Sequence, residues 1–153
     1  MVVVVPPNAE LEPGFSHWYQ KLVSIAKEGG MSICMYAAPK TLVELENQGK
    51  INSNSLKTEY KSFSNWEDFL VFSGELETND LFVIVSSRKG HVSYINQLDK
   101  LPYYLSNYFK NNSFLLLYPA QTEHGLMMDK LDHVDSSLIE TIASVGNLFK
   151  KKN

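Results

Sequence analysis

Residues 80–94 decide the fold of this chain: Asp-Leu-Phe-Val-Ile-Val-Ser-Ser-Arg-Lys-Gly-His-Val-Ser-Tyr. Five apolar residues, Leu81 to Val85, stop abruptly at two serines, two cations and a glycine. An uninterrupted apolar run of this length is typical of a strand that is buried on both faces of a parallel sheet. Ligands of open parallel sheets bind just beyond the carboxyl ends of the strands. The sequence therefore predicts a central strand at 81–85, and the polar loop after it is the first candidate for a binding site.

The composition is that of one ordinary globular domain. The chain has 153 residues, 44% hydrophobic and 20% charged, with a formal net charge of -3. This length suffices for one core, and the negative charge argues against a general nucleic-acid binder. No apolar run approaches the roughly 20 residues of a membrane helix, so we expect a soluble domain. A lone Cys34 excludes an intramolecular disulfide and a cysteine zinc cluster, and its apolar neighbours indicate a buried thiol.

Strand-like and helix-like segments alternate along the whole chain. Apolar runs predict strands at 2–5, 31–36, 81–85 and 114–118, and polar–apolar alternation predicts an edge strand at 58–63. Helical spacing predicts helices at 16–28, 41–49, 64–76, 99–109 and 135–150. The predicted N-caps of the first four helices are Ser16, Thr41, Ser64 and Asp99, and Pro102 suits the first turn of the fourth.

This alternation predicts an α/β fold with a five-stranded, mostly parallel, doubly wound sheet in a three-layer sandwich. Because the third strand is polar, it belongs at an edge, which suits the order 3-2-1-4-5. The loops after Val5 and Val85 then flank one crevice. We expect a single domain over 1–153, in which 1–119 form the core sheet and helices, 120–134 a connector and 135–150 a terminal helix.

The predicted crevice holds the candidate ligand-binding residues. The loop after the fourth strand offers hydroxyls, two cations and a flexible backbone, which together can hold a phosphate or a carboxylate. The loop matches neither glycine fingerprint of the nucleotide-binding folds, so a solvated turn is the alternative interpretation. After the first strand, a rigid strand exit is the alternative to a binding wall. The candidates are Asn8, Ser86, Ser87, Arg88, Lys89, Gly90, His91 and Ser93.

The sequence contains no recognisable catalytic or metal-binding motif. No Gly-x-Ser-x-Gly elbow supports a hydrolase triad. The densest group of metal-capable side chains has no three members at a known ligand spacing and is interpreted as a solvated connector. We therefore predict no catalytic residue, no metal site and no enzymatic activity. That group consists of Glu123, His124, Asp129, Asp132, His133 and Asp135.

The fifth strand, 114–118, is too apolar for a bare sheet edge. Three coverings are open at this stage: the segment 120–134, the terminal helix, or a second copy of the chain. The last of these leads us to expect a homodimer through this edge.

Several segments of the chain carry a resemblance to one protein family. They are Val4–Phe15, Asp68–Leu70, Ser86–Gly90 with Ser93-Tyr94, Asp99–Pro102, and Asn112–Phe114 with Tyr118-Pro119. These segments resemble the cytosolic C-terminal domain of bacterial cation/proton antiporters of the sodium/proton and glutathione-gated potassium type, as found in Bacteroidetes, a domain that is similar to universal stress proteins. The resemblance spans about 3–120 and implies a Rossmann-like, adenine nucleotide alpha hydrolase-like fold. It also implies a regulatory module for ion transport, joined to the transmembrane antiporter domain of the same polypeptide, at the cytosolic side of the inner membrane.

The resemblance does not extend to the nucleotide-binding signature. ATP-binding universal stress proteins carry Gly-x-x-Gly, then nine residues, then Gly-Ser/Thr after the fourth strand. This chain has Ser87-Arg88-Lys89-Gly90 and neither of the later glycines, and it lacks their acid directly after the first strand. We therefore expect no nucleotide cofactor. The alternative function is a free-standing universal-stress-like protein that binds a nucleotide.

Overall fold

The computed structural model describes residues 1–51 and 56–121. Within them, five strands form one sheet in the order β3-β2-β1-β4-β5, and every neighbouring pair is parallel. The predicted order is confirmed, and the sheet is entirely rather than mostly parallel. The predicted terminal helix at 135–150 and the metal-capable group at 123–135 lie outside the described residues. The strands are β1 (Val2–Val4), β2 (Ile33–Ala37), β3 (Thr58–Ser62), β4 (Leu81–Val85) and β5 (Ser113–Leu117).

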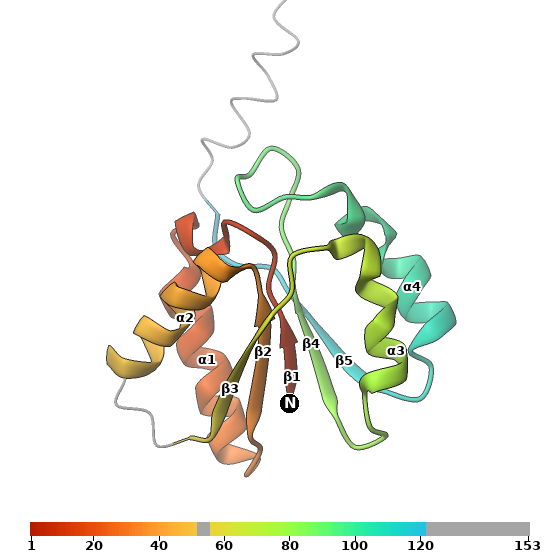
Figure 1. Ribbon diagram of the computed structural model, residues 1–153, viewed down its shortest axis with the longest axis horizontal. Helices are drawn as coiled ribbons and strands as arrows, with labels where there is room; N and C mark the ends of the chain where they lie inside the picture. The colour runs from red at the N-terminus through yellow and green to blue at the C-terminus, as the bar shows by residue number, and fades with distance from the viewer. Residues whose placement is uncertain (52–55, 122–153) are drawn as a thin grey trace, which may run out of the picture.

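Helices cover both faces of the sheet and make it the middle of three layers (Figure 1). In the described chain, one face carries α1 (Phe15–Glu28) and α2 (Pro39–Ile51), and the other carries α3 (Phe72–Glu75) and α4 (Leu101–Tyr108). Right-handed crossovers explain this division, because the chain moves from β1 to β3 in one direction across the sheet and from β3 to β5 in the other. Three 3-10 turns are described between these elements: η1 (Ala9–Leu11), η2 (Trp66–Val71) and η3 (Asn96–Lys100).

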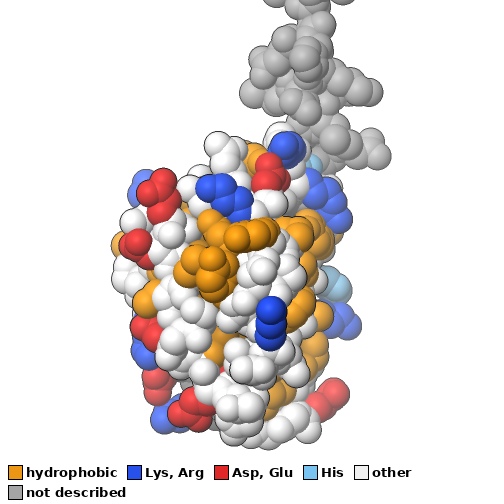
Figure 2. Space-filling view, turned by 90° about the vertical axis from the view of Figure 1, so that its right-hand side faces the viewer, with side chains coloured by type: hydrophobic (Ala, Val, Ile, Leu, Met, Phe, Trp, Pro, Cys, Tyr) orange, Lys and Arg blue, Asp and Glu red, His pale blue; other side chains and the backbone are white. Residues whose placement is uncertain are grey.

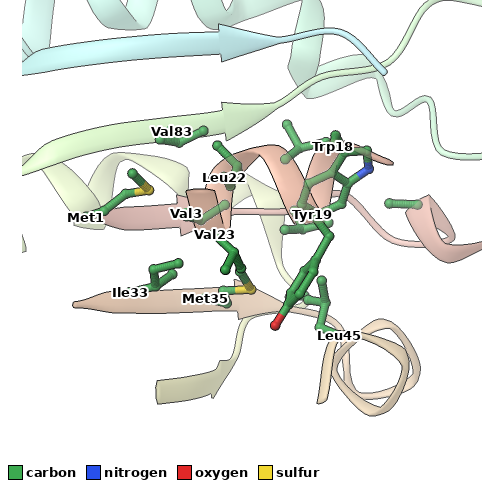
Figure 3. Close-up of a cluster of buried hydrophobic side chains, with 14 of the residues drawn as sticks. Met1, Val3, Trp18, Tyr19, Leu22, Val23, Ile33, Met35, Leu45 and Val83 are labelled. Carbon is green, nitrogen blue, oxygen red and sulfur yellow. The ribbon is translucent and has the colours of Figure 1, made fainter. Parts of the chain in front are cut away.

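The sheet separates two hydrophobic cores. On the α1/α2 face, Trp18, Tyr19 and Leu22 of α1 pack on mainly aliphatic side chains of the sheet (Figure 3). The α3/α4 face is aromatic, with Phe82 and Phe109 stacked at a ring distance of 5.1 Å. Burying a side chain of this size contributes about 1.5–3 kcal/mol, so each core is a major source of stability. The aromatic core contains Trp66, Phe69, Phe72, Phe82 and Phe109.

The predicted caps differ from the observed ones. Helix α1 begins at Phe15, before Ser16, and its N-cap is Gly14. Helix α2 begins at Pro39 because a proline in the first turn forfeits no helical hydrogen bond, and it runs past Gly49 to Ile51. Thr41 therefore lies inside α2, where its hydroxyl donates to Glu10 Oε2 at 2.7 Å.

Two further caps are corrected on the other face of the sheet. Asn65, not Ser64, is the N-cap of η2, because its side-chain oxygen accepts from the Glu67 N–H two residues on. Asp99 lies within η3 and does not cap α4, whereas Pro102 occupies the first turn of α4 as predicted.

Cys34 was predicted to be buried, but on β2 it is only half-buried. It lies on the more open side of the strand, beside Tyr36 and Lys61, and burial raises the pKa of its thiol. Within 1–51 and 56–121, no helix combines the length and the apolar character needed to cross a membrane.

Candidate functional site

The loops that follow β1, β4 and β5 meet at the carboxyl end of the sheet (Figure 1). Asn8 Nδ2 donates to the Val92 carbonyl oxygen at 3.3 Å, which joins the first loop to the second. The Gly14 N–H donates to the Ala120 carbonyl oxygen at 3.1 Å, which joins the start of α1 to the segment after β5. A Cβ atom on Gly14 would lie 2.7 Å from the Ala120 backbone, so this approach requires glycine. The loops after β1 and β4, which were predicted to flank one crevice, therefore lie side by side, and the place where they meet is called the crevice.

A buried carboxylate, that of Glu12, lies at the centre of this crevice. Its Oε1 accepts three bonds: from the Ser93 N–H at 3.3 Å, from Ser93 Oγ at 2.7 Å and from Gln121 Nε2 at 3.0 Å. Its Oε2 lies 3.9 Å from His91 Nδ1, and the two side chains are only 4% and 5% exposed. A buried carboxylate is costly unless hydrogen bonds replace its water, and these donors supply them.

The two serines after β4 face the protein interior. Ser86 is buried, and its N–H donates to the Leu117 carbonyl oxygen, which extends the pairing of β4 with β5. Ser87 Oγ lies 2.9 Å from Ser93 Oγ and accepts from Gln121 Nε2 at 2.7 Å. The Ser86 N–H and the Ser87 hydroxyl therefore both form hydrogen bonds within the chain.

Arg88 points towards the exit of β5. Its Nη1 donates to the Pro119 carbonyl oxygen at 3.1 Å and to Gln121 Oε1 at 3.2 Å, and its guanidinium lies 5.3 Å from the centre of the Tyr118 ring. The Arg88 backbone N–H also donates to Gln121 Oε1, at 3.2 Å. This cation is therefore bonded to the segment after β5.

Lys89 lies at the exposed rim of the loop. Its Nζ is 3.2 Å from Asp99 Oδ2, which also accepts from the Tyr94 hydroxyl at 2.8 Å. The bond from Tyr94 and the nearby Lys89 hold the pKa of Asp99 below its ordinary value. Partial desolvation and the same carboxylate raise the pKa of the Tyr94 phenol. The turn between these side chains contains Gly90 at φ +83°, a backbone conformation that favours glycine.

The structure brings three of the predicted residues together and separates the others. Ser93 and His91 face the Glu12 carboxylate, and Ser87 lies against Ser93. By contrast, Asn8 bonds to the loop after β4, Arg88 contacts the segment after β5 and Lys89 contacts η3. The loop after β4 does hold a carboxylate, but that carboxylate belongs to the chain itself.

Two residues of the crevice, Glu12 and Gln121, were not among the candidates that the sequence suggested. Glu12 lies beyond η1 and does not follow β1 directly, so its position did not suggest a place at the end of that strand. Gln121 follows Pro119, where the sequence suggested only a connector. The available signal was an acid and an amide on segments that leave β1 and β5 at the same end of the sheet. In the described part of the chain, no three histidine, cysteine, aspartate or glutamate side chains are arranged to hold a metal ion.

The β5 edge is the second notable surface. Phe114 and Tyr118 are 45% and 51% exposed, and Leu115, which points to the opposite face of the strand, is 38% exposed. Tyr103 and Tyr108 of α4 extend the exposed aromatic surface on the α3/α4 side. A view from that side shows a group of hydrophobic side chains at the surface (Figure 2).

Comparison with protein-family models, with curated proteins and with solved structures finds no match to this chain. The structure shows the fold class of this chain. It is a doubly wound, all-parallel α/β domain whose crevice is bonded internally and whose fifth strand leaves an apolar edge exposed among the described residues.

Proposed function

We propose that this chain is a non-catalytic regulatory domain of a membrane cation/proton antiporter, which acts at the cytosolic side through contact between two copies. The segment resemblance over about 3–120 supports the link to a transporter. The observation that carries the regulatory contact is the β5 edge, because apolar side chains project from both faces of an edge strand. Strands of this kind pair with another strand unless charge or a cover prevents it.

A two-fold axis through Leu115 would suit this edge. Antiparallel pairing about that residue places Leu115 beside its own copy and Phe114 opposite Leu116 of the second copy. The pairing continues the sheet from one subunit to the other and places no like charges opposite each other within Ser113–Leu117. A closed dimer would thus cover exposed backbone groups and apolar side chains together.

Such a contact can regulate transport only if its free energy differs between two states of the transporter. A dimer of regulatory domains meets this condition when the attached transmembrane halves move relative to each other. The role requires no catalytic group, which agrees with the crevice, where the described polar side chains bond to one another.

Light scattering during size-exclusion chromatography tests the subunit contact. The 153-residue chain should elute as a dimer at high concentration and dissociate on dilution. A monomer at every concentration would contradict the contact. The reading frame upstream of Val2 tests the transporter link: a series of apolar spans of about 20 residues supports it, and an in-frame stop codon contradicts it.

The second candidate is a free-standing, universal-stress-like nucleotide-binding protein. The hydroxyls of Ser87 and Ser93 beyond the carboxyl end of β4 favour it, because nucleotides bind at this place in doubly wound sheets. The Glu12 carboxylate argues against it, since it already accepts from the Ser93 hydroxyl and repels phosphate. A thermal-shift series with nucleotides decides between them: a nucleotide-specific rise in Tm that Arg88→Ala abolishes would favour this candidate.

A further inference from the structure

We propose that the crevice is an oxyanion site whose resident anion is the chain's own Glu12 carboxylate. A free carboxylate or phosphate then binds only where that side chain has been removed. This inference is independent of the contact at the β5 edge, because it concerns the groups beneath the loop after β4.

The donors around Glu12 have the geometry of a ligand site. Three N–H or O–H groups, two from Ser93 and one from Gln121, point at the single atom Oε1 at 2.7–3.3 Å. They come from the loop after β4 and the segment after β5, while the carboxylate belongs to Glu12, directly after η1. Convergence of donors from separate loops at the carboxyl ends of strands is how open parallel sheets hold anionic ligands.

Arg88 orients the donor of Gln121. An amide has one oxygen, which accepts, and one nitrogen, which donates, so the neighbours decide which end points inward. The Arg88 backbone and guanidinium both donate to Gln121 Oε1, which leaves Nε2 to face Glu12 and Ser87. Arg88 therefore fixes the orientation of the Gln121 amide, and this amide in turn donates to the Glu12 carboxylate.

The charge of Glu12 explains why the native crevice would exclude a second anion. A phosphate that used Ser93 and Ser87 would have to lie beside a buried carboxylate with the same sign of charge, in a medium that screens charge poorly. The His91 imidazole also faces this carboxylate, with Nδ1 3.9 Å from Glu12 Oε2. The donors of Ser93 and Gln121 are thus already bonded to a carboxylate of the chain itself.

Chemical rescue tests this assignment. Glu12→Ala removes a CH2–COO⁻ fragment, so acetate is the matching probe, and sodium chloride at equal ionic strength is the salt control. In the variant, acetate should raise Tm in a saturable way, by about 2–4 °C at several times its Kd. The unmodified chain should show no more shift with acetate than with chloride. Inorganic phosphate, run in parallel, shows whether the same donors also hold a tetrahedral anion.

Glu10→Ala is the matched control. Glu10 lies in η1, two residues from Glu12, but its carboxylate accepts from Thr41 of α2 and not from the crevice donors. Acetate should leave the Tm of this variant unchanged relative to chloride. An equal acetate shift in Glu10→Ala, in Glu12→Ala and in the unmodified chain would overturn the proposal, and so would the absence of any shift in a folded Glu12→Ala.

The test remains decisive if Glu12→Ala does not fold in chloride. Glu12→Ser keeps a small polar side chain at this position, and the space beyond it still admits acetate. If neither variant folds in chloride, the readout becomes the yield of folded protein after refolding in acetate or in chloride. A yield that rises only in acetate supports the resident-anion assignment, and equal yields in the two salts overturn it.

Discussion

The crevice and the β5 edge lie on the same half of the sheet, yet their chemistry is opposite. In the crevice, Glu12, Ser87, Ser93 and Gln121 are polar, and each bonds to another of the set. At the edge, Phe114 and Leu115 are apolar and remain well exposed in the described chain. The polar side chains of the crevice bond to one another, whereas the apolar side chains of the edge lie exposed in the described chain.

The difference indicates where intermolecular contacts are expected. A ligand gains little from a donor that is already bonded, because it must first replace the existing partner at a similar free energy. Apolar surface gains from any cover that removes it from water, at about 25 cal/mol per Å². Binding is therefore expected at the edge before the crevice, even though the crevice has the residues that first attract attention in the sequence.

The largest expected effect is on association through the edge. Leu115→Lys should weaken the proposed dimer by about 100-fold or more, because two facing ammonium groups cost several kcal/mol. Light scattering over a dilution series measures this change. Ser62→Lys, at the opposite edge on β3, is the matched control and should leave association unchanged. Equal weakening by both substitutions would remove the distinction between the two edges.

The next effect is on stability through the crevice. Glu12→Ala should lower the free energy of unfolding by about 1–3 kcal/mol, because the buried hydroxyl of Ser93 and the amide of Gln121 lose a charged acceptor. Urea titration followed by circular dichroism measures the loss. The dimer constant should not change. A Glu12→Ala chain of unaltered stability would mean that the carboxylate is not held as described.

A smaller loss is expected at Ser93. Ser93→Ala removes one of the three bonds to Glu12 Oε1 and leaves the Ser93 N–H and Gln121 in place, so about 1 kcal/mol should be lost. Combined with Glu12→Ala, the two losses should sum to more than the double variant shows, because both substitutions break the same bond. Strict additivity in the urea titrations would separate the two side chains.

The smallest effect is expected at the exposed pair of Lys89 and Asp99. The pKa of Asp99 in the folded chain is depressed by Tyr94 and by Lys89, so its stabilising contribution is present above the ordinary value of 3.8. That contribution is lost as the pH falls through the lower folded pKa. Asp99→Asn should change Tm less than Ser93→Ala does at pH 7, and no longer differ from the native chain at the acid limit. Thermal melts between pH 2 and 7 measure this. A larger change at pH 7 would give the rim a structural role.

The fold could be predicted from the sequence because its signals are local. The apolar runs at β1, β4 and β5 and the polar pattern of β3 define both the strands and the edge position of β3. The place of the crevice then follows from strand order alone. Helix starts were less predictable, because Thr41 and Asp99 have suitable cap chemistry but bond instead to distant or neighbouring side chains.

The interior of the crevice could not be predicted in the same way. The partner of Ser93 is Glu12, 81 residues away in the sequence, and Gln121 is 109 residues from Glu12. Which carboxylate fills the site depends on how the chain after η1 places Glu12 against the loop after β4, and no periodic pattern predicts that arrangement. The direction of Arg88, towards Pro119 and not into the crevice, depends on the same tertiary arrangement.

The placement of one tryptophan in each core has an experimental consequence. Trp18 lies among Phe15 and Tyr19 on one side of the sheet, and Trp66 stacks on Phe69 on the other, with a ring distance of 5.7 Å. Trp18→Phe and Trp66→Phe would each leave a single indole emitter that reports on one layer. Fluorescence from the two variants can then show whether the layers separate from the sheet in one event or in succession.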